Sequence, residues 1–93
     1  MEDKILTRHP EGKAGVNISR DKYEQMRSAI VEIIEEKESV GFSEMGDLLT
    51  SRLKDSFEGS ILWYYTTVKL DLEARGEIER YKQKGKQMIR LSK

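Results

Sequence analysis

Apolar residues recur with a helical period between residues 19 and 37, and they predict the first helix of the chain. They fall at i, i+3, i+7, i+10 and i+11, as Tyr23, Met26, Ile30, Ile33 and Ile34. This spacing places them on one helical face, which we expect to be buried. Ser19 stands just before the run, so its hydroxyl is expected to cap the first turn. The four glutamates between residues 32 and 38 lie mostly off this face, which favours a solvated surface over an acidic docking site.

The period breaks at residues 39–42, and a second helix is predicted over residues 43–53. Val40 and Phe42 suit an edge strand of two or three residues. Ser43 is expected to cap the helix that follows. The apolar face of this helix consists of Met45, Leu48, Leu49 and Leu53. Phe57 is expected to be buried within the connecting turn at residues 54–59.

A third helix and a hairpin complete the pattern. The helix is predicted over residues 60–75, with Ser60 as its N-cap and Gly76 just past its end, where glycine suits the left-handed conformation. Residues 77–81 and 87–91 then form two β-like runs, separated by the five residues Lys82–Lys86. Two such runs around a glycine-containing connection predict a β-hairpin.

The predicted order is helix, short strand, helix, helix and two-stranded hairpin, which is the order of a winged helix-turn-helix. We therefore expect a mostly α, α+β winged-helix fold, with the helix-turn-helix and its wing at residues 39–91. Residues 19–93 are expected to form the domain. Residues 1–18 are expected to be an extended N-terminal arm. Four apolar residues suit docking of the arm on the domain: Ile5, Leu6, Val16 and Ile18.

The end of the third helix and the following strand resemble the core of winged-helix regulators. The shared pattern stands here as Val68, Leu72, Glu73, Gly76, Ile78 and Arg80. Longer stretches at residues 9–30 and 57–80, with the basic last strand, resemble a family of short, uncharacterised bacterial winged-helix proteins. The resemblance implies a stand-alone bacterial, cytoplasmic domain and brings no established activity. In winged-helix regulators the third helix faces the DNA major groove and the hairpin contacts the backbone or the minor groove.

Composition narrows the chemistry. The 93 residues fit one small domain, and the absence of cysteine excludes disulfides and thiolate metal sites. The lone histidine, His9, is expected to be an ordinary surface or packing residue, because a zinc site needs further ligands. The longest apolar run, Ile61–Tyr65, is too short to cross a bilayer. Met1 is followed by Glu2 and Asp3, which is not typical of a secretory signal, so a cytoplasmic location is expected.

The sequence predicts no enzyme. The glycines lack the spacing of a phosphate-binding loop, and no serine or threonine stands in a nucleophile motif. The carboxylates fall on solvated helix faces, and the methionines suit core filling better than ligation. We therefore expect neither a cofactor nor a metal, and no catalytic residue.

The predicted wing carries the clearest signal for nucleic acid. The candidate phosphate contacts are Arg80, Lys82, Lys84, Lys86 and Arg90. Lysines on a mobile tip suit phosphate, which positions a protein but carries no sequence information. The alternative is a lysine-rich edge that keeps the hairpin from pairing with another sheet. Binding through the wing would be weak and sensitive to salt.

The outer face of the third helix is a poor match to a DNA reader. A helical projection places Trp63, Thr66, Leu70 and Glu73 on it, flanked by Leu62, Thr67, Lys69 and Ala74. A major-groove helix usually presents arginines, lysines or amides. An apolar patch at Leu62, Trp63, Thr66 and Leu70 instead predicts contact with something else. The N-terminal arm, a second copy of the chain and a different protein all remain candidates.

Two functions therefore remain open. The first is a nucleic-acid-binding, regulator-like module that contacts phosphate through the basic wing. The alternative is a protein-interaction module or homodimer that uses the apolar outer face of the third helix without binding DNA. The net charge of zero, from 17 basic and 17 acidic residues, favours the second.

Overall fold

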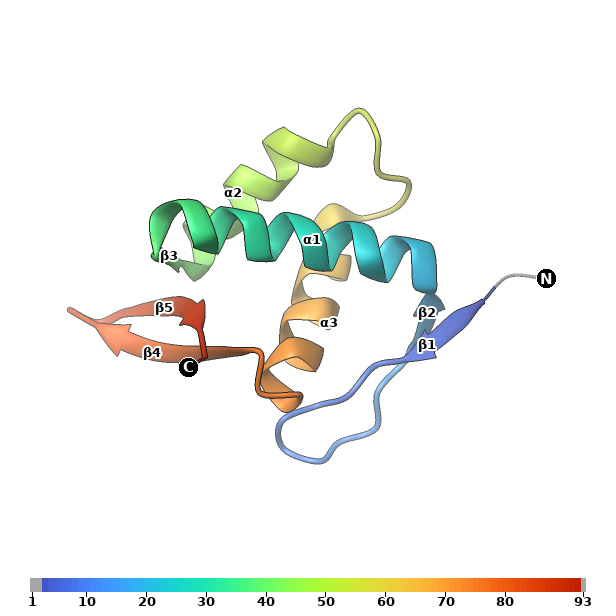
Figure 1. The fold of residues 1–93 in the computed structure, drawn as a ribbon, viewed down its shortest axis with the longest axis horizontal. Helices are drawn as coiled ribbons and strands as arrows, with labels where there is room; N and C mark the ends of the chain where they lie inside the picture. Colours follow the sequence, from blue (N-terminus) through green and yellow to red (C-terminus); the bar gives the residue numbers. More distant parts are fainter. Residues whose placement is uncertain (1–2, 93) are drawn as a thin grey trace.

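Three helices and two small antiparallel sheets form an α+β fold in the computed structural model, which describes residues 3–92 (Figure 1). The elements follow one another as β1 (Lys4–Leu6), β2 (Asn17–Ser19), α1 (Arg20–Lys37), β3 (Ser39–Gly41), α2 (Phe42–Leu53), α3 (Ile61–Ala74), β4 (Ile78–Gln83) and β5 (Lys86–Leu91). None of the helices within residues 3–92 is long and apolar enough to cross a membrane.

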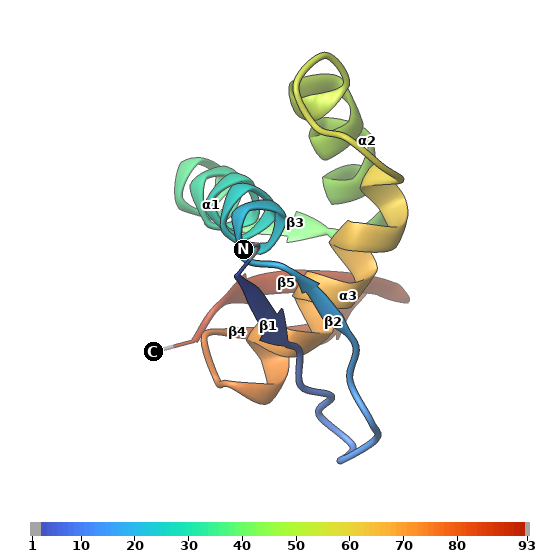
Figure 2. The same cartoon turned by 90° about the vertical axis from the view of Figure 1, so that its right-hand side faces the viewer.

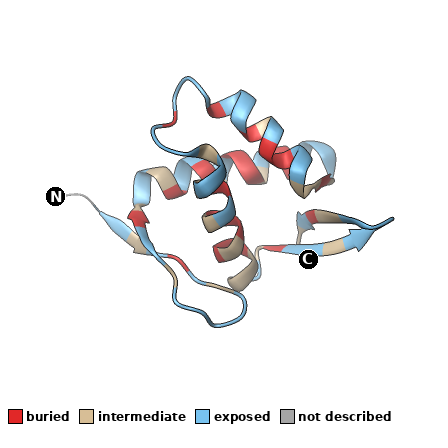
Figure 3. Ribbon diagram, turned by 180° about the vertical axis from the view of Figure 1, so that it is seen from behind, coloured by how far each residue is buried: buried red, intermediate tan, exposed pale blue. Residues whose placement is uncertain are grey.

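The three helices enclose one hydrophobic core (Figure 3). All five periodic residues of α1 are buried, which confirms the predicted apolar face. Met45 and Leu49 of α2 and Val68 and Leu72 of α3 are fully buried against them. Phe57 is only 7% exposed, so its predicted burial within the connecting turn is confirmed.

The larger sheet joins the last strand to the start of α2. Its strand order is β3-β5-β4. Ile89 of the central strand lies between Val40 of β3 and Arg80 of β4. Val40 and Ile89 are fully buried, so this end of the sheet belongs to the core. The far end of the β4–β5 hairpin extends away from the helices (Figure 1).

The N-terminal residues form a hairpin where a single extended segment was predicted. Strands β1 and β2 pair antiparallel beside the start of α1, and residues 7–16 form the loop between them (Figure 2). Ile18 is buried and Ile5 is half-buried, whereas Leu6 and Val16 are exposed. The strand pair therefore docks through the residues that point toward α1.

One predicted helix cap is confirmed in position only, and the other is wrong. Ser19 is the N-cap residue of α1, as predicted, but its side chain makes no capping hydrogen bond. Helix α2 begins at Phe42 with Gly41 as its N-cap, so Ser43 lies inside the first turn and does not cap it. The last residue of β3 is therefore also the N-cap of α2, and glycine has no side chain that could cap the helix.

The limits of α3 are confirmed. The Ser60 hydroxyl accepts a hydrogen bond from the Trp63 amide at 3.2 Å. Gly76 follows the helix with a φ of 76°, in the left-handed region that glycine favours.

The β4–β5 hairpin, for which the label wing is kept, has longer strands and a shorter turn than predicted. Its strands continue to Gln83 and restart at Lys86, so the turn contains two residues where five were predicted. Lys84 and Gly85 have φ values of 52° and 79°. Positive φ at both positions is the geometry of the two-residue turns that match the twist of a hairpin.

Candidate nucleic-acid interface

Helix α3 lies between two projecting segments. The β4–β5 wing extends on one side of it, and the loop at residues 7–16 extends on the other (Figures 1 and 3). A surface that a partner could contact therefore consists of the outer face of α3 and these two flanks.

Three of the five predicted phosphate contacts gather at the end of the wing. Lys82, Lys84 and Lys86 are exposed, and none of them takes part in an ion pair within residues 3–92. Lys84 stands in the turn, and Gln83 pairs with Lys86 beside it. The wing end therefore concentrates unneutralised positive charge.

The other two predicted contacts are engaged by carboxylates. Arg80 lies 3.4 Å from an oxygen of Glu73, although about half of its side chain is exposed. Arg90 forms a 2.6 Å ion pair with Glu79 and stacks over the Tyr81 ring at 4.3 Å. These arginines are less available to phosphate than the three lysines.

Strand alternation divides the basic residues between the two faces of the wing. Arg80 and Lys82 lie on the face that also carries Ile78 and Ile89, which is the side of α3. Lys86 and Arg90 belong to the opposite face. The wing is therefore not a single basic edge, and Lys84 at the turn is shared by both faces.

The predicted interaction patch on α3 is partly open. Leu62 and Trp63 are 56% and 47% exposed, Thr66 is exposed and Leu70 is half-buried. Trp63 contacts the edge of the neighbouring Tyr64 ring. The N-terminal arm does not bury Trp63, since its loop lies beside Thr67 and Leu70 further along the helix.

The prediction that Lys69 and Glu73 face outward is wrong. Their side chains are only 4% and 7% exposed and form an ion pair at 2.5 Å. The Lys69 ammonium also lies 5.2 Å from the centre of the Phe42 ring. The Lys69 side chain therefore lies beside Phe42, and Glu73 neutralises its charge inside the protein. As a result, α3 presents neither charge at its outer face.

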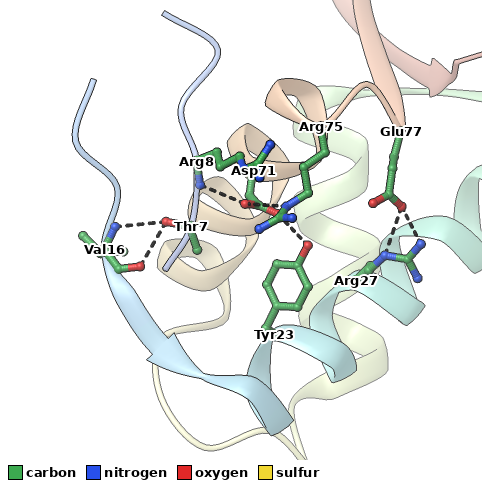
Figure 4. A network of polar contacts seen from close by, with 8 residues as sticks. All are labelled: Thr7, Arg8, Val16, Tyr23, Arg27, Asp71, Arg75 and Glu77. Atoms are coloured by element: carbon green, nitrogen blue, oxygen red, sulfur yellow. Dashed lines mark hydrogen bonds and ion pairs between the residues drawn. The ribbon is translucent and has the colours of Figure 1, made fainter. Parts of the chain in front are cut away.

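Asp71 is a residue that the sequence analysis did not single out. It is fully buried and accepts hydrogen bonds from the Tyr23 hydroxyl, from Arg75 Nε at 2.8 Å and from the Arg8 backbone amide at 2.8 Å (Figure 4). Beside this network, Arg27 of α1 is paired with Glu77. Among the described residues, every buried side-chain nitrogen and oxygen has a partner.

The network perturbs the ionisation of Tyr23. Burial is the main cause that raises the pKa of its phenol above the ordinary value, and the hydrogen bond to the Asp71 carboxylate raises it further. A separate hydrogen bond from Arg75 to Asp71 raises the pKa of the Arg75 guanidinium. The cluster therefore holds a neutral tyrosine and a charged arginine around one carboxylate, an arrangement suited to structural support.

The two ends of the arm loop are joined by hydrogen bonds between Thr7 and Val16. The Thr7 hydroxyl accepts from the Val16 amide at 3.0 Å and donates to the Val16 carbonyl at 3.1 Å (Figure 4). A Cβ at Gly15 would stand 1.7 Å from the Thr7 carbonyl oxygen, so only glycine fits there. His9 is half-buried, and its Nδ1 accepts from the Glu11 amide at 3.1 Å.

A signal for Asp71 was present in the helical period. It stands three residues after Val68, seven after Tyr64 and four before Arg75, and these spacings share one face of a helix. A carboxylate at such a position needs buried partners. Arg75 could be named from this spacing, but the partners from α1 and the arm, Tyr23 and Arg8, could not.

The described residues contain no group of three or more His, Asp or Glu side chains that could hold a metal ion. Comparison with known proteins finds no matching curated protein and no matching solved structure. Residues 4–88 match a family of unknown function, DUF6958. Because the match covers most of the sequence, the chain belongs to this family of unknown function.

Proposed function

We propose that the chain is a winged-helix domain that binds duplex nucleic acid through phosphate contacts from its wing. The order of the elements supports the fold assignment, because a short strand, two helices and a hairpin follow α1. The sheet order β3-β5-β4 and the contact between β4 and α3 are compatible with a wing and support this assignment. The proposed role is binding, with no catalytic step.

The observation that carries the proposal is the set of three lysines at the wing end. Lys82, Lys84 and Lys86 are exposed, and none of them forms an ion pair with a carboxylate within residues 3–92. Each can neutralise a phosphate and release a counterion, so three contacts predict a salt slope of about −2.7. Such contacts position a protein on a duplex without reading its sequence.

The outer face of α3 favours binding without strong sequence preference. It presents Leu62, Trp63 and Thr66, and lacks the arginine and amide groups that make paired hydrogen bonds to base edges. We therefore expect similar affinities for duplexes of different sequence at the same salt concentration.

The test compares two triple variants in binding to a fluorescent random duplex at about 50 mM salt. The wing variant carries Lys82→Gln, Lys84→Asn and Lys86→Gln, with asparagine chosen because it tolerates the positive φ of the turn. The control variant carries Lys4→Gln, Lys37→Gln and Lys54→Gln, which removes the same charge from exposed positions elsewhere.

The wing variant is expected to lose at least about tenfold in affinity and most of the salt dependence, and the control variant to lose much less. Equal losses would show that net charge alone determines binding, and this would refute a wing interface. Absence of binding by the unaltered protein at low salt would refute the proposed function as a whole.

A further inference from the structure

We infer that the outer face of α3 is a contact surface for a second copy of this chain. The surface, here called the α3 strip, consists of Leu62, Trp63, Thr66, Thr67 and Leu70. Leu62 and Trp63 are two of the four large hydrophobic residues that are exposed within residues 3–92, and they are adjacent in one helix. Exposed apolar groups gathered in this way mark interaction sites.

The charges of α3 decide which partner fits. Lys69, Asp71 and Glu73 are the charged residues of this helix, and all three are buried in pairs within the molecule. The α3 strip is therefore neutral. A nucleic acid requires cations at its contact surface, whereas a neutral apolar strip offers it none.

A neutral strip is complementary to itself. In a twofold contact the same surface is present on both partners, so any charge at its centre would face its own like charge. The α3 strip avoids this repulsion, with Thr66 at its middle. The net charge of zero also removes the long-range repulsion that keeps highly charged proteins apart.

The size of the strip predicts a weak dimer. Helix α3 has 14 residues and is therefore about 21 Å long. Stable dimers bury about 800 Å² on each partner, which is more than one face of such a helix supplies. The neighbouring arm loop and α2 border the α3 strip and would add little further contact area. Association should therefore depend strongly on protein concentration.

The first measurement is sedimentation of the unaltered chain over about a hundredfold range of concentration without nucleic acid. We expect a monomer–dimer equilibrium that changes little between about 0.1 M and 0.5 M salt, because apolar contacts are not screened. Trp63 is the only tryptophan. Its emission should shift to the blue as the dimer forms.

A matched pair of variants locates the contact. Thr66→Arg places two arginines together at the centre of the strip. Thr50→Arg is the control, because Thr50 is likewise exposed and also donates its hydroxyl to the carbonyl four residues earlier, but on α2. We expect Thr66→Arg to raise the dimer dissociation constant at least about tenfold, and Thr50→Arg to leave it unchanged.

Mixing distinguishes a lost contact from a damaged fold. Thr66→Arg and Thr66→Glu should each be monomeric alone and should associate when combined, since opposite charges then meet. A monomer at every concentration, salt-sensitive association, equal effects of both arginine variants or failure of the mixture to associate would each overturn the inference.

If the arm or a duplex covers the α3 strip in place of a second copy, the fluorescence of Trp63 behaves differently. A blue-shifted Trp63 in a strict monomer would mean that the arm covers the strip. Protection of Trp63 by duplex in place of a second copy would mean that α3 itself enters a groove. Either result overturns the dimer, and neither depends on the wing variants, so the two proposals can fail separately.

Discussion

Two carboxylates two residues apart on α3 support opposite sides of the molecule. Asp71 points toward α1 and the arm, and Glu73 points toward the wing. Positions two apart on a helix are separated by about 200°, so one helix can serve both sides. Both side chains are nearly inaccessible to solvent, yet their partners differ in number and in how far they are buried.

The arm side is held more firmly than the wing side. Asp71 joins three separate places in the sequence: Tyr23 on α1, Arg75 and the backbone of Arg8. Glu73 joins Lys69 of its own helix and Arg80, which is half exposed. A polar network contributes most when it is buried and connects distant segments. The difference therefore teaches that the arm is tied to α1 and α3 through buried contacts, whereas the tie between Glu73 and the wing is half exposed.

The largest expected effect comes from removing the charge of Asp71. Asp71→Asn should lower the free energy of unfolding by about 3 kcal/mol, because the partly buried Arg75 and the buried Tyr23 hydroxyl lose their anionic acceptor. Glu73→Gln should cost less, about 2 kcal/mol, because Arg80 can turn to solvent and the new amide oxygen can still accept from the Lys69 ammonium, although that buried charge loses its counter-ion.

Urea unfolding of the two variants measures this comparison. Exchange of the Arg8 amide adds a local readout, because that amide donates to Asp71 and should lose protection in Asp71→Asn. If Glu73→Gln proves at least as destabilising as Asp71→Asn, the proposed ranking of the two sides is wrong.

Tyr23 gives a smaller effect with a distinctive pH dependence. Tyr23→Phe should cost about 1.5 kcal/mol at neutral pH through the lost hydrogen bond to a charged acceptor. Because burial and Asp71 raise the phenol pKa in the folded state, the unfolded chain releases this proton first as pH rises. The stability from Tyr23 is therefore complete below about pH 10 and is lost above it.

Tyr65 is the natural comparison for this titration. Burial, with a smaller effect of Glu73, also raises the pKa of its phenol, and its hydroxyl donates to the Phe42 carbonyl at 2.9 Å. Tyr23→Phe should therefore make the alkaline loss of stability shallower without abolishing it. An unchanged dependence on pH in the variant would mean that Tyr23 does not titrate with unfolding.

The smallest expected effect is at Arg80. Its side chain is 53% exposed and its nearest Glu73 oxygen is 3.4 Å away, so Arg80→Gln should change the free energy of unfolding by less than about 0.5 kcal/mol. Thermal unfolding at low and high salt measures it. A loss that matches Tyr23→Phe would show that the wing is anchored as firmly as the arm.

Local patterns in the sequence predicted most of the framework. The apolar period of α1, the Ser60 cap and the Gly76 stop each depend on residues close together in the chain, and all are confirmed. The predicted cap at Ser43 failed because β3, paired with β5, ends at Gly41 and not at Phe42, so α2 begins at Phe42. That pairing joins residues almost fifty positions apart, which local pattern cannot show.

The candidate surface was harder to predict than the fold. A helical projection places Lys69 and Glu73 outward, but it contains no information on where α2 packs or on how far a lysine stem reaches. The exposure of Leu62 and Trp63 was read correctly, because both lie far from the core direction of the helix. Asp71 required knowledge of the arm and of α1 together.

The position of β5 has a consequence for synthesis. It is the central strand of the sheet, between β3 and β4, yet it is the last element in chain order. Val40 therefore cannot pair until Ile89 has been synthesised, and the sheet cannot form completely until residues 86–91 have left the ribosome. Until then β3 and β4 expose unpaired edges, which favour aggregation. A chain released before this strand is made would contain all three helices but not β5, so β3 and β4 would have no partner in the sheet.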